Sequence, residues 1–303
     1  MDRKKTLHLL LILNLVLALS GFDQTHAQQQ HSLELERATW NHSTLRVLLT
    51  PPNNVSWWKP YYLDATVRAI SQWNHGILHF ASNYTAYSYL SNLRMTLTVA
   101  PTNDSVFDIF ISWTETPAYG ADAIGKSFLW SNGETGIYID SSIYLSSKML
   151  PNYVLSEVDM QNIALHELGH SLGLGHINRT GDVMHLNYPL KTFTQVRPLS
   201  TLDLYGVSIV FQWMSNSSPP YHYRPQQSSV TLPPSIAFQY LPISNADLPL
   251  SQLLRTFIQN LINNVMNLIK RPETVILIVA TGVILLVAAL ILAGRRLKRP
   301  KTR

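Results

Sequence analysis

One eleven-residue segment, HELGHSLGLGH, constrains the fold of this chain more than any other. It begins at His166, and a second histidine, His170, follows four residues later. Residues four apart share one face of an α-helix, so both imidazoles can reach one metal ion. Gly173 lets the helix end, because glycine tolerates positive φ, and the chain can then turn back to bring His176 to the same ion. The segment therefore predicts a helix, a tight turn and a metal site with three histidine ligands.

Three protein ligands are typical of a catalytic zinc site, because the fourth position is left to water. Zinc lowers the pKa of bound water from about 15.7 to roughly 7 and polarises a carbonyl group, so it also stabilises a developing oxyanion. Glu167 follows the first ligand, so it can accept a proton from that water and pass it to a leaving amine. The predicted reaction is the hydrolysis of peptide bonds without a covalent intermediate.

The segment resembles the metzincin pattern HExxHxxGxxH, and Met184 lies where that clan places the methionine of its Met-turn. Three other segments resemble the matrixin branch of the clan. Residues 108–112 are similar to its third strand, residues 125–128 to the edge strand above its cleft, and residues 199–203 to the start of its last helix. The resemblance covers about residues 36–214.

The resemblance implies roles for individual residues. The three histidines match the zinc ligands and Glu167 matches the general base. Met184 matches the methionine beneath the metal, and Tyr188 matches a tyrosine on the wall of the specificity pocket. In matrixins the substrate lies extended along the edge strand as an added strand, so the backbone near Ser127, Phe128 and Leu129 is expected to contact the peptide.

The chain departs from the matrixin pattern in several places. Ile177 stands where matrixins have Ser or Thr, and Leu186 stands where their Met-turn continues with Pro. No histidine between 110 and 145 could form a second, structural zinc site, and the absence of cysteine excludes a cysteine switch. Calcium is a further candidate metal ion. Its candidate ligands are Asp122, Glu134 and Asp140. Each of these acids is equally consistent with a solvated charge on a loop.

Hydrophobic periodicity and capping signals predict three helices. Apolar residues recur every three or four positions over 61–77. Ser156 and Ser200 each begin a capping box, which predicts that the zinc helix and a last helix, running to about residue 213, start there. Strands are expected at 45–49, 94–99, 106–113, 120–130 and 136–143. This order predicts an α/β (α+β) domain with a twisted mixed sheet and a zinc cleft between two lobes.

The remaining segments predict an exported, membrane-anchored protein. Residues 1–27 resemble a signal peptide, and an uncharged apolar run near the C-terminus is long enough to span a bilayer. The basic tail after that run places the preceding residues outside the cell. We expect a signal peptide over 1–27, a catalytic domain over 28–214 that begins flexibly, a Pro/Ser-rich stalk over 215–249, an amphipathic helix over 250–271, a transmembrane helix over 275–294 and a cytoplasmic tail over 295–303.

The amphipathic helix could lie on the membrane, pair between subunits or pack on the domain. Nine of the 23 basic residues lie at the two ends of the chain, and the middle, with 14 basic and 16 acidic residues, has a net charge near −2. A nucleic-acid partner is therefore not indicated. Six N-x-S/T sequons predict glycosylation, at Asn41, Asn54, Asn83, Asn103, Asn178 and Asn216.

The sequence thus favours a type I membrane-anchored, extracellular zinc endopeptidase that acts on peptides or proteins. One alternative is a non-catalytic surface binding protein on a metzincin scaffold. The intact set of three histidines and a glutamate argues against it, because a degenerate enzyme need not keep the base. A second alternative is a peptidase that acts on cell-wall or surface-layer components.

Overall fold

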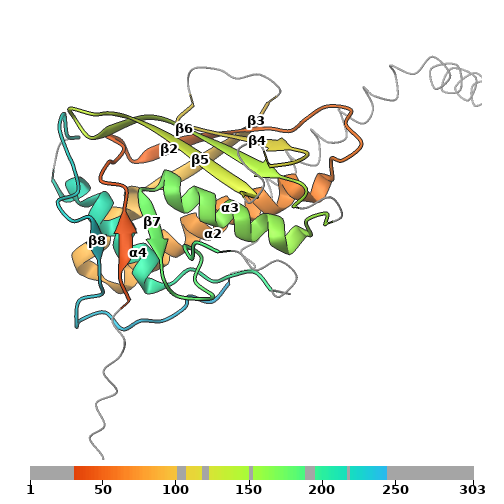
Figure 1. Cartoon of the computed structure of the whole chain (residues 1–303). Coiled ribbons are helices and arrows are strands. Elements are labelled where there is room, and N and C mark those ends of the chain that lie inside the picture. Colours follow the sequence, from red (N-terminus) through yellow and green to blue (C-terminus); the bar gives the residue numbers. More distant parts are fainter. Residues whose placement is uncertain are drawn as a thin grey trace, which may run out of the picture. The chain divides into compact units, whose positions relative to one another are not determined.

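A computed structural model describes residues 31–100, 107–117, 123–149, 153–187, 195–216 and 219–243 of the 303-residue chain (Figure 1). The expected signal peptide, amphipathic helix, transmembrane helix and basic tail lie outside these residues. Within them, no helix combines the length and the apolar character needed to cross a bilayer. The described residues all fall in one compact unit, 1–244.

A five-stranded sheet forms one side of this unit. Its strands are β2 (Thr44–Thr50), β3 (Arg94–Val99), β4 (Ile109–Thr114), β5 (Gly125–Asn132) and β6 (Ile137–Ser146), in the spatial order β3-β2-β4-β6-β5. The first four strands in that order are parallel, and β5 is antiparallel to β6. The sheet is therefore mixed, as expected, and β5 forms one of its edges.

Two long helices, α2 (Pro60–Asn83) and α3 (Glu157–Ser171), lie beside each other below the sheet in Figure 1. The apolar positions that predicted α2 are all buried, which confirms the helical period of that segment; they are Leu63, Val67, Ile70 and Trp73. The helix continues six residues beyond the expected end at residue 77, into a 3₁₀ segment, η1 (Thr85–Asn92).

Buried polar contacts fix α3 between α2 and the sheet. The indole of Trp73 on α2 donates to the Leu165 carbonyl over 2.9 Å, and the indole of Trp40 donates to the Ser171 carbonyl over 2.8 Å. On the sheet side, the hydroxyl groups of Ser141 and Ser171 are 2.7 Å apart. Because a buried polar group is costly when it is unpaired, these bonds define the position of the helix along its axis.

A second sheet has three short antiparallel strands in the order β7-β1-β8 (Figure 1). These are β1 (Leu33–Leu35), β7 (Leu174–Ile177) and β8 (Ser229–Val230). The expectation of a flexible start to the domain is therefore wrong for β1, whose Leu33 and Leu35 are buried. Helix α4 (Thr201–Val210) packs behind this sheet and continues into a 3₁₀ turn, η2 (Gln212–Ser215).

Residues 219–243, which make up most of the described part of the expected stalk, lie on the domain. Three apolar side chains of this segment are buried, namely Val230, Ile236 and Leu241. Its backbone also pairs with the start of α4: the Thr201 amide donates to the Gln239 carbonyl over 2.9 Å. The structure thus differs from the stalk prediction here. Prolines and serines predict extended backbone, and the segment is largely extended, but its few apolar residues are enough to hold it in place.

Candidate metal centre

Helix α3 presents the first two histidines of the motif. Ser156 caps its first turn together with Asp159, which confirms the predicted capping box. The helix ends at Ser171, and Gly173 follows with a φ of 88°, as expected from the need for a tight turn. Strand β7 then carries His176 back toward the helix. The third histidine therefore lies on a strand, which the sequence did not predict.

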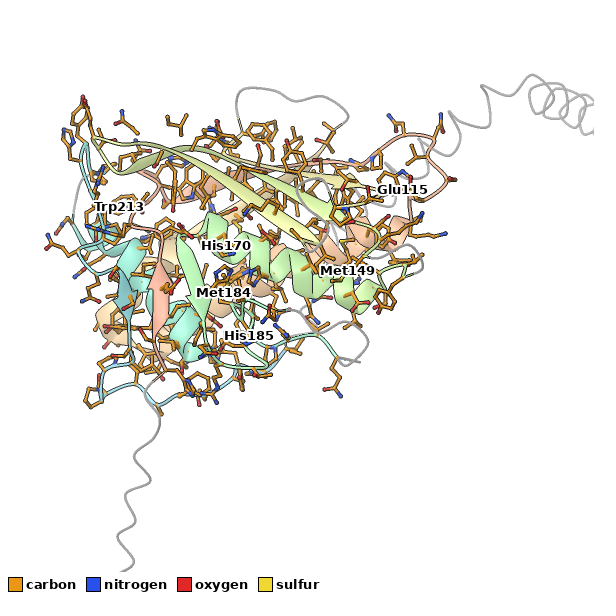
Figure 2. The ribbon with its side chains drawn as sticks, viewed as in Figure 1. Glu115, Met149, His170, Met184, His185 and Trp213 are labelled. Carbon is orange, nitrogen blue, oxygen red and sulfur yellow. The ribbon has the colours of Figure 1, made fainter. Side chains whose placement is uncertain are left out.

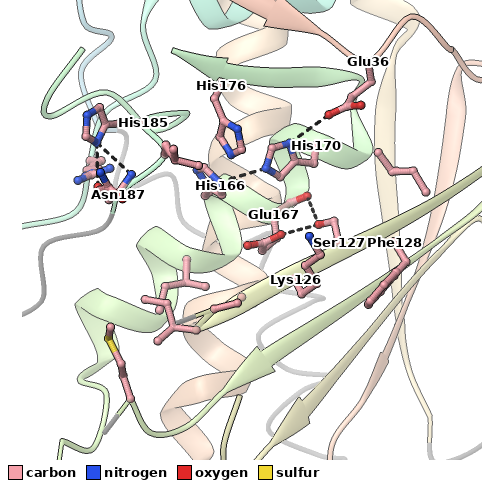
Figure 3. Close-up of a pocket in the computed structure, with 18 residues that line it drawn as sticks. Glu36, Lys126, Ser127, Phe128, His166, Glu167, His170, His176, His185 and Asn187 are labelled. Carbon is pink, nitrogen blue, oxygen red and sulfur yellow. Dashed lines mark hydrogen bonds and ion pairs between the residues drawn. The ribbon is translucent and has the colours of Figure 1, made fainter. Parts of the chain in front are cut away.

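The three imidazoles converge on one point (Figure 3), and His170 lies beneath the sheet in the view of Figure 2. Their ring centroids are 4.7 Å apart for His166 and His170, 4.8 Å for His170 and His176, and 5.3 Å for His166 and His176. One nitrogen from each ring can be chosen so that all three lie within 4.8 Å of one another. Among the described residues this is the one group of three or more His or carboxylate side chains that could hold a metal ion.

Backbone carbonyl groups fix the orientation of two of the rings. His166 Nδ1 lies 2.8 Å from the Val183 carbonyl oxygen, and His170 Nδ1 lies 2.8 Å from the Leu174 carbonyl oxygen. A carbonyl only accepts, so both Nδ1 atoms carry the proton and donate it. Both Nε2 atoms then present lone pairs to the centre, which is the usual arrangement of histidine ligands.

This arrangement fits a metal cation. The Nε2 atoms of His166 and His170 are 3.1 Å apart, and with both lone pairs directed inward they repel each other. A proton could relieve the repulsion, but burial lowers the pKa of each ring to about 4. Near neutral pH a metal ion is therefore the more favourable partner. Three nitrogen ligands suit zinc.

Glu167 lies beside the metal centre, and its side chain is buried. Its Oε2 accepts a hydrogen bond of 2.6 Å from the Ser127 hydroxyl on β5. Burial raises the pKa of the carboxyl, whereas the neighbouring His170 and the Ser127 hydrogen bond oppose this effect. The carboxylate does not join the group of ligand atoms, so it remains available to exchange a proton.

Met184 closes the site from below. Its side chain is fully buried and lies against Gly169, where a methyl group would collide with its sulfur atom. The Met184 amide donates to Asp182 Oδ1 over 3.1 Å. Burial and the nearby charge of Asp182 raise the pKa of Asp203 on α4. Arg197 adds a 2.7 Å bond to the Asp182 carbonyl oxygen.

The centre opens into a cleft of about 1040 Å³ between β5, α3 and the residues after Met184 (Figure 3). Ser127, Phe128 and Leu129 line it, as the resemblance implied, although the role of their backbone in substrate binding stays a prediction. Tyr188 lies outside the described residues. So does the calcium candidate Asp122, and the other two, Glu134 and Asp140, belong to no group of described residues suited to a metal.

Among the other residues that line the cleft, four have a titratable side chain for which the sequence predicted no role, namely Glu36, Lys126, His185 and Arg197. Glu36 follows β1, and its Oε1 lies 3.9 Å from His170 Nδ1. It directly follows the segment that was expected to be flexible, and it belongs to no motif. His185 and Arg197 belong to no sequence motif, because a single titratable residue carries no signal of its own.

Comparisons with known proteins agree with this geometry. Residues 102–212 match the model of the matrixin peptidase family. A 135-residue stretch is 24% identical to metalloendoproteinase 1 of Glycine max. That stretch covers 43% of this chain and 40% of the soybean protein, so the chain spans about two fifths of the length of this curated relative.

Proposed function

We propose that the protein is a zinc-dependent endopeptidase with Glu167 as its general base. The resemblance of its catalytic domain to matrixin-like metzincins supports this proposal. One observation carries the proposal. Three histidines from a helix and a strand direct their free nitrogens to one point, and a buried carboxylate that is not a ligand lies beside them. A structural site would use a fourth protein ligand instead.

In this proposal His166, His170 and His176 hold the zinc ion. The ion, when bound, lowers the pKa of a coordinated water to roughly 7 and polarises the scissile carbonyl group. The Val183 and Leu174 carbonyl groups keep the first two rings in the correct tautomer and orientation, so the donor atoms need no rearrangement to bind.

Glu167 accepts the proton of the attacking water and then donates it to the nitrogen of the leaving amine. The carboxylate returns to its starting state, so no covalent bond to the enzyme is formed. The burial of Glu167 suits this role. Because burial raises the pKa of the carboxyl group, that group can hold the proton between its removal from the water and its transfer to the amine. The substrate strand is proposed to lie along the free edge of β5, where backbone groups of an edge strand are available for pairing.

A substitution that keeps the shape of the base tests the mechanism. Glu167→Gln should lower peptide hydrolysis by about 10²–10⁴-fold, because the amide cannot accept the proton, while the bound zinc, measured by metal analysis, stays at one ion per chain. Glu157→Gln is the matched control: this glutamate lies on the same helix, paired with Arg68 and away from the centre, and its loss should leave the rate unchanged.

Two results would contradict the proposal. If Glu167→Gln hydrolyses peptides at the wild-type rate, the assignment of the base is wrong. If the wild-type protein binds zinc but cleaves nothing in a diverse peptide library, the scaffold serves binding and not catalysis.

We also propose that the catalytic domain faces the exterior of a cell and is anchored by residues 275–294. The support comes from the sequence of the two apolar segments and from exposed asparagines in five of the six sequons; these are Asn41, Asn54, Asn83, Asn178 and Asn216. Protease added to intact cells should digest the domain. A glycosidase should increase its electrophoretic mobility. A domain that resists the protease until the cells are lysed would contradict this location.

A further inference from the structure

The side chain of Ser127 contacts the residue that we propose as the base. Its hydroxyl oxygen lies 2.6 Å from Glu167 Oε2 and 3.0 Å from the Glu167 carbonyl oxygen. A hydroxyl group has one proton to donate. The shorter distance lies in the range of a charge-assisted bond to a carboxylate. The proton therefore goes to Oε2, and the hydroxyl fixes one of the two carboxylate oxygens.

The strand that carries Ser127 lies directly against the same side chain. A methyl group at Gly125 would collide with Glu167 Oε1 and would lie 2.6 Å from Ile163 Cγ2. Residues two apart point to the same face of a strand, so Gly125 and Ser127 both face α3. The glycine allows the close approach of the strand, and the serine supplies the hydrogen bond. Strand β5 thus restrains both oxygen atoms of the Glu167 carboxylate: Ser127 contacts Oε2, and Gly125 lies against Oε1.

We propose that Ser127 is a positioning residue for Glu167, an inference that rests on the proposed function. A glutamate side chain has several rotatable bonds, and a base must be held close to its productive geometry. The serine selects one orientation in which Oε2 is occupied and Oε1 takes the proton of the water. The strand expected to bind substrate through its backbone therefore also orients the base through a side chain.

This role differs from a substrate contact in its kinetic effect. A serine that binds the peptide would change KM when it is removed, because it stabilises substrate and transition state alike. A serine that orients the base would change kcat, because its effect is expressed only during proton transfer. The backbone of β5 is unchanged by a substitution at Ser127, so its pairing with a peptide should persist.

Steady-state kinetics on a peptide substrate test the proposal. Ser127→Ala should lower kcat by about 10–100-fold, the usual cost of losing a partner that orients a functional group, with KM within about twofold. Ser127→Thr retains a hydroxyl and should recover most of the rate. Ser131→Ala removes an exposed serine from the same strand and should have no effect. Combined with Glu167→Gln, the alanine variant should cause no further loss.

A second measurement needs neither zinc nor activity. In metal-free protein, Ser127→Ala should lower the urea midpoint of unfolding when Glu167 is present. In a Glu167→Ala background the same substitution should lower the midpoint by clearly less, because the carboxylate acceptor is gone and only the backbone carbonyl oxygen of residue 167 remains as an acceptor. Zinc affinity, measured by competition with a chelator, should change by less than about twofold.

Several outcomes would overturn the inference. A raised KM with unchanged kcat would make Ser127 a substrate contact. Equal shifts of the urea midpoint in both backgrounds would show that the serine acts elsewhere. If the zinc-loaded wild-type protein is inactive, the proposed function fails and the positioning role with it. If the wild type is active and Ser127→Ala retains its full kcat, only the positioning role fails.

Discussion

At the scale of single residues, Gly169 shows how the motif serves packing as well as metal binding. It lies in the interior of α3 between the two helical ligands, a position where glycine costs about 1 kcal/mol relative to alanine. The space that a side chain would fill is occupied by the Met184 thioether, with Trp73 Cζ2 only 3.3 Å from the site of an added methyl group. The close contact of the methionine therefore explains the glycine.

Gly169→Ala tests this explanation because two effects oppose each other. Better helix propensity gains about 1 kcal/mol, whereas forcing a methyl group into a filled space costs typically 1–3 kcal/mol. We expect a net loss of about 1 kcal/mol in the free energy of unfolding, measured with urea, together with weaker zinc binding. Gly133→Ala, where no atom lies within 4 Å of the added carbon, should be neutral. A stabilised Gly169→Ala protein would contradict the packing argument.

At the scale of secondary-structure elements, Asp108 connects two parallel strands. Its buried carboxylate accepts from the Arg46 amide over 2.7 Å and from the Arg46 guanidinium, and it lies 3.3 Å from His42 Nε2. Burial alone would raise its pKa, but the nearby His42 ring and the hydrogen bonds from Arg46 outweigh that effect and lower the pKa to about 2. The contact thus ties the start of β4 to β2 in their parallel register.

The lowered pKa gives a definite pH dependence. The ionised carboxylate stabilises the fold above the ordinary aspartate pKa near 4, and this contribution is lost as the pH falls through about 2. Since a tenfold change in an acid dissociation constant corresponds to about 1.36 kcal/mol, the contribution amounts to about 2 kcal/mol. The difference in urea stability between the wild type and Asp108→Asn, measured without metal, should still be present at about pH 5 and shrink below about pH 4.

The exposed Glu134 provides the control, since Glu134→Gln should show no comparable change. A difference between the wild type and Asp108→Asn that widens as the pH falls would mean that Asp108 is not stabilised in its charged form.

At the scale of the whole molecule, residues 219–243 belong to the folded unit. Besides burying three apolar side chains, the segment places the Phe238 ring under the Arg179 guanidinium, with 3.6 Å between the guanidinium carbon and the ring centroid. Arg179 follows β7, the strand of the third histidine. The matched family region ends at residue 212, so this segment supports the metal centre from outside that region.

A protein that spans residues 28–216 should therefore be less stable than one that spans residues 28–243. Full burial of an apolar side chain is worth about 1.5–3 kcal/mol, and part of this gain is offset by ordering the segment. We expect a lower urea midpoint and weaker zinc binding for the shorter protein. Tyr221→Ala, which removes an exposed ring from the same segment, should leave the longer protein unchanged. Equal midpoints for the two lengths would restore the interpretation of the segment as a stalk.

The sequence predicted those parts of the molecule that are encoded locally. The capping boxes at Ser156 and Ser200, the period of α2 and the turn at Gly173 depend on residues within a few positions of one another. The short strands β1, β7 and β8 depend on partners far along the chain and are too brief to show alternation. For the same reason the contact between Ser127 and Glu167 was not foreseen, because it is set by the position of β5 over α3.

The three-stranded sheet also has a consequence for the order of events during synthesis. Leu33 is among the first residues of the domain to be made, yet its partners in the sheet are Ile177 and Val230. Strand β1 must stay unpaired until those residues have emerged, and β8, the last of the three strands to be made, completes the sheet that holds the His176 strand. A chain still on the ribosome thus contains all three histidines before that sheet is complete, so the metal centre would be fully supported only as translation of the domain ends.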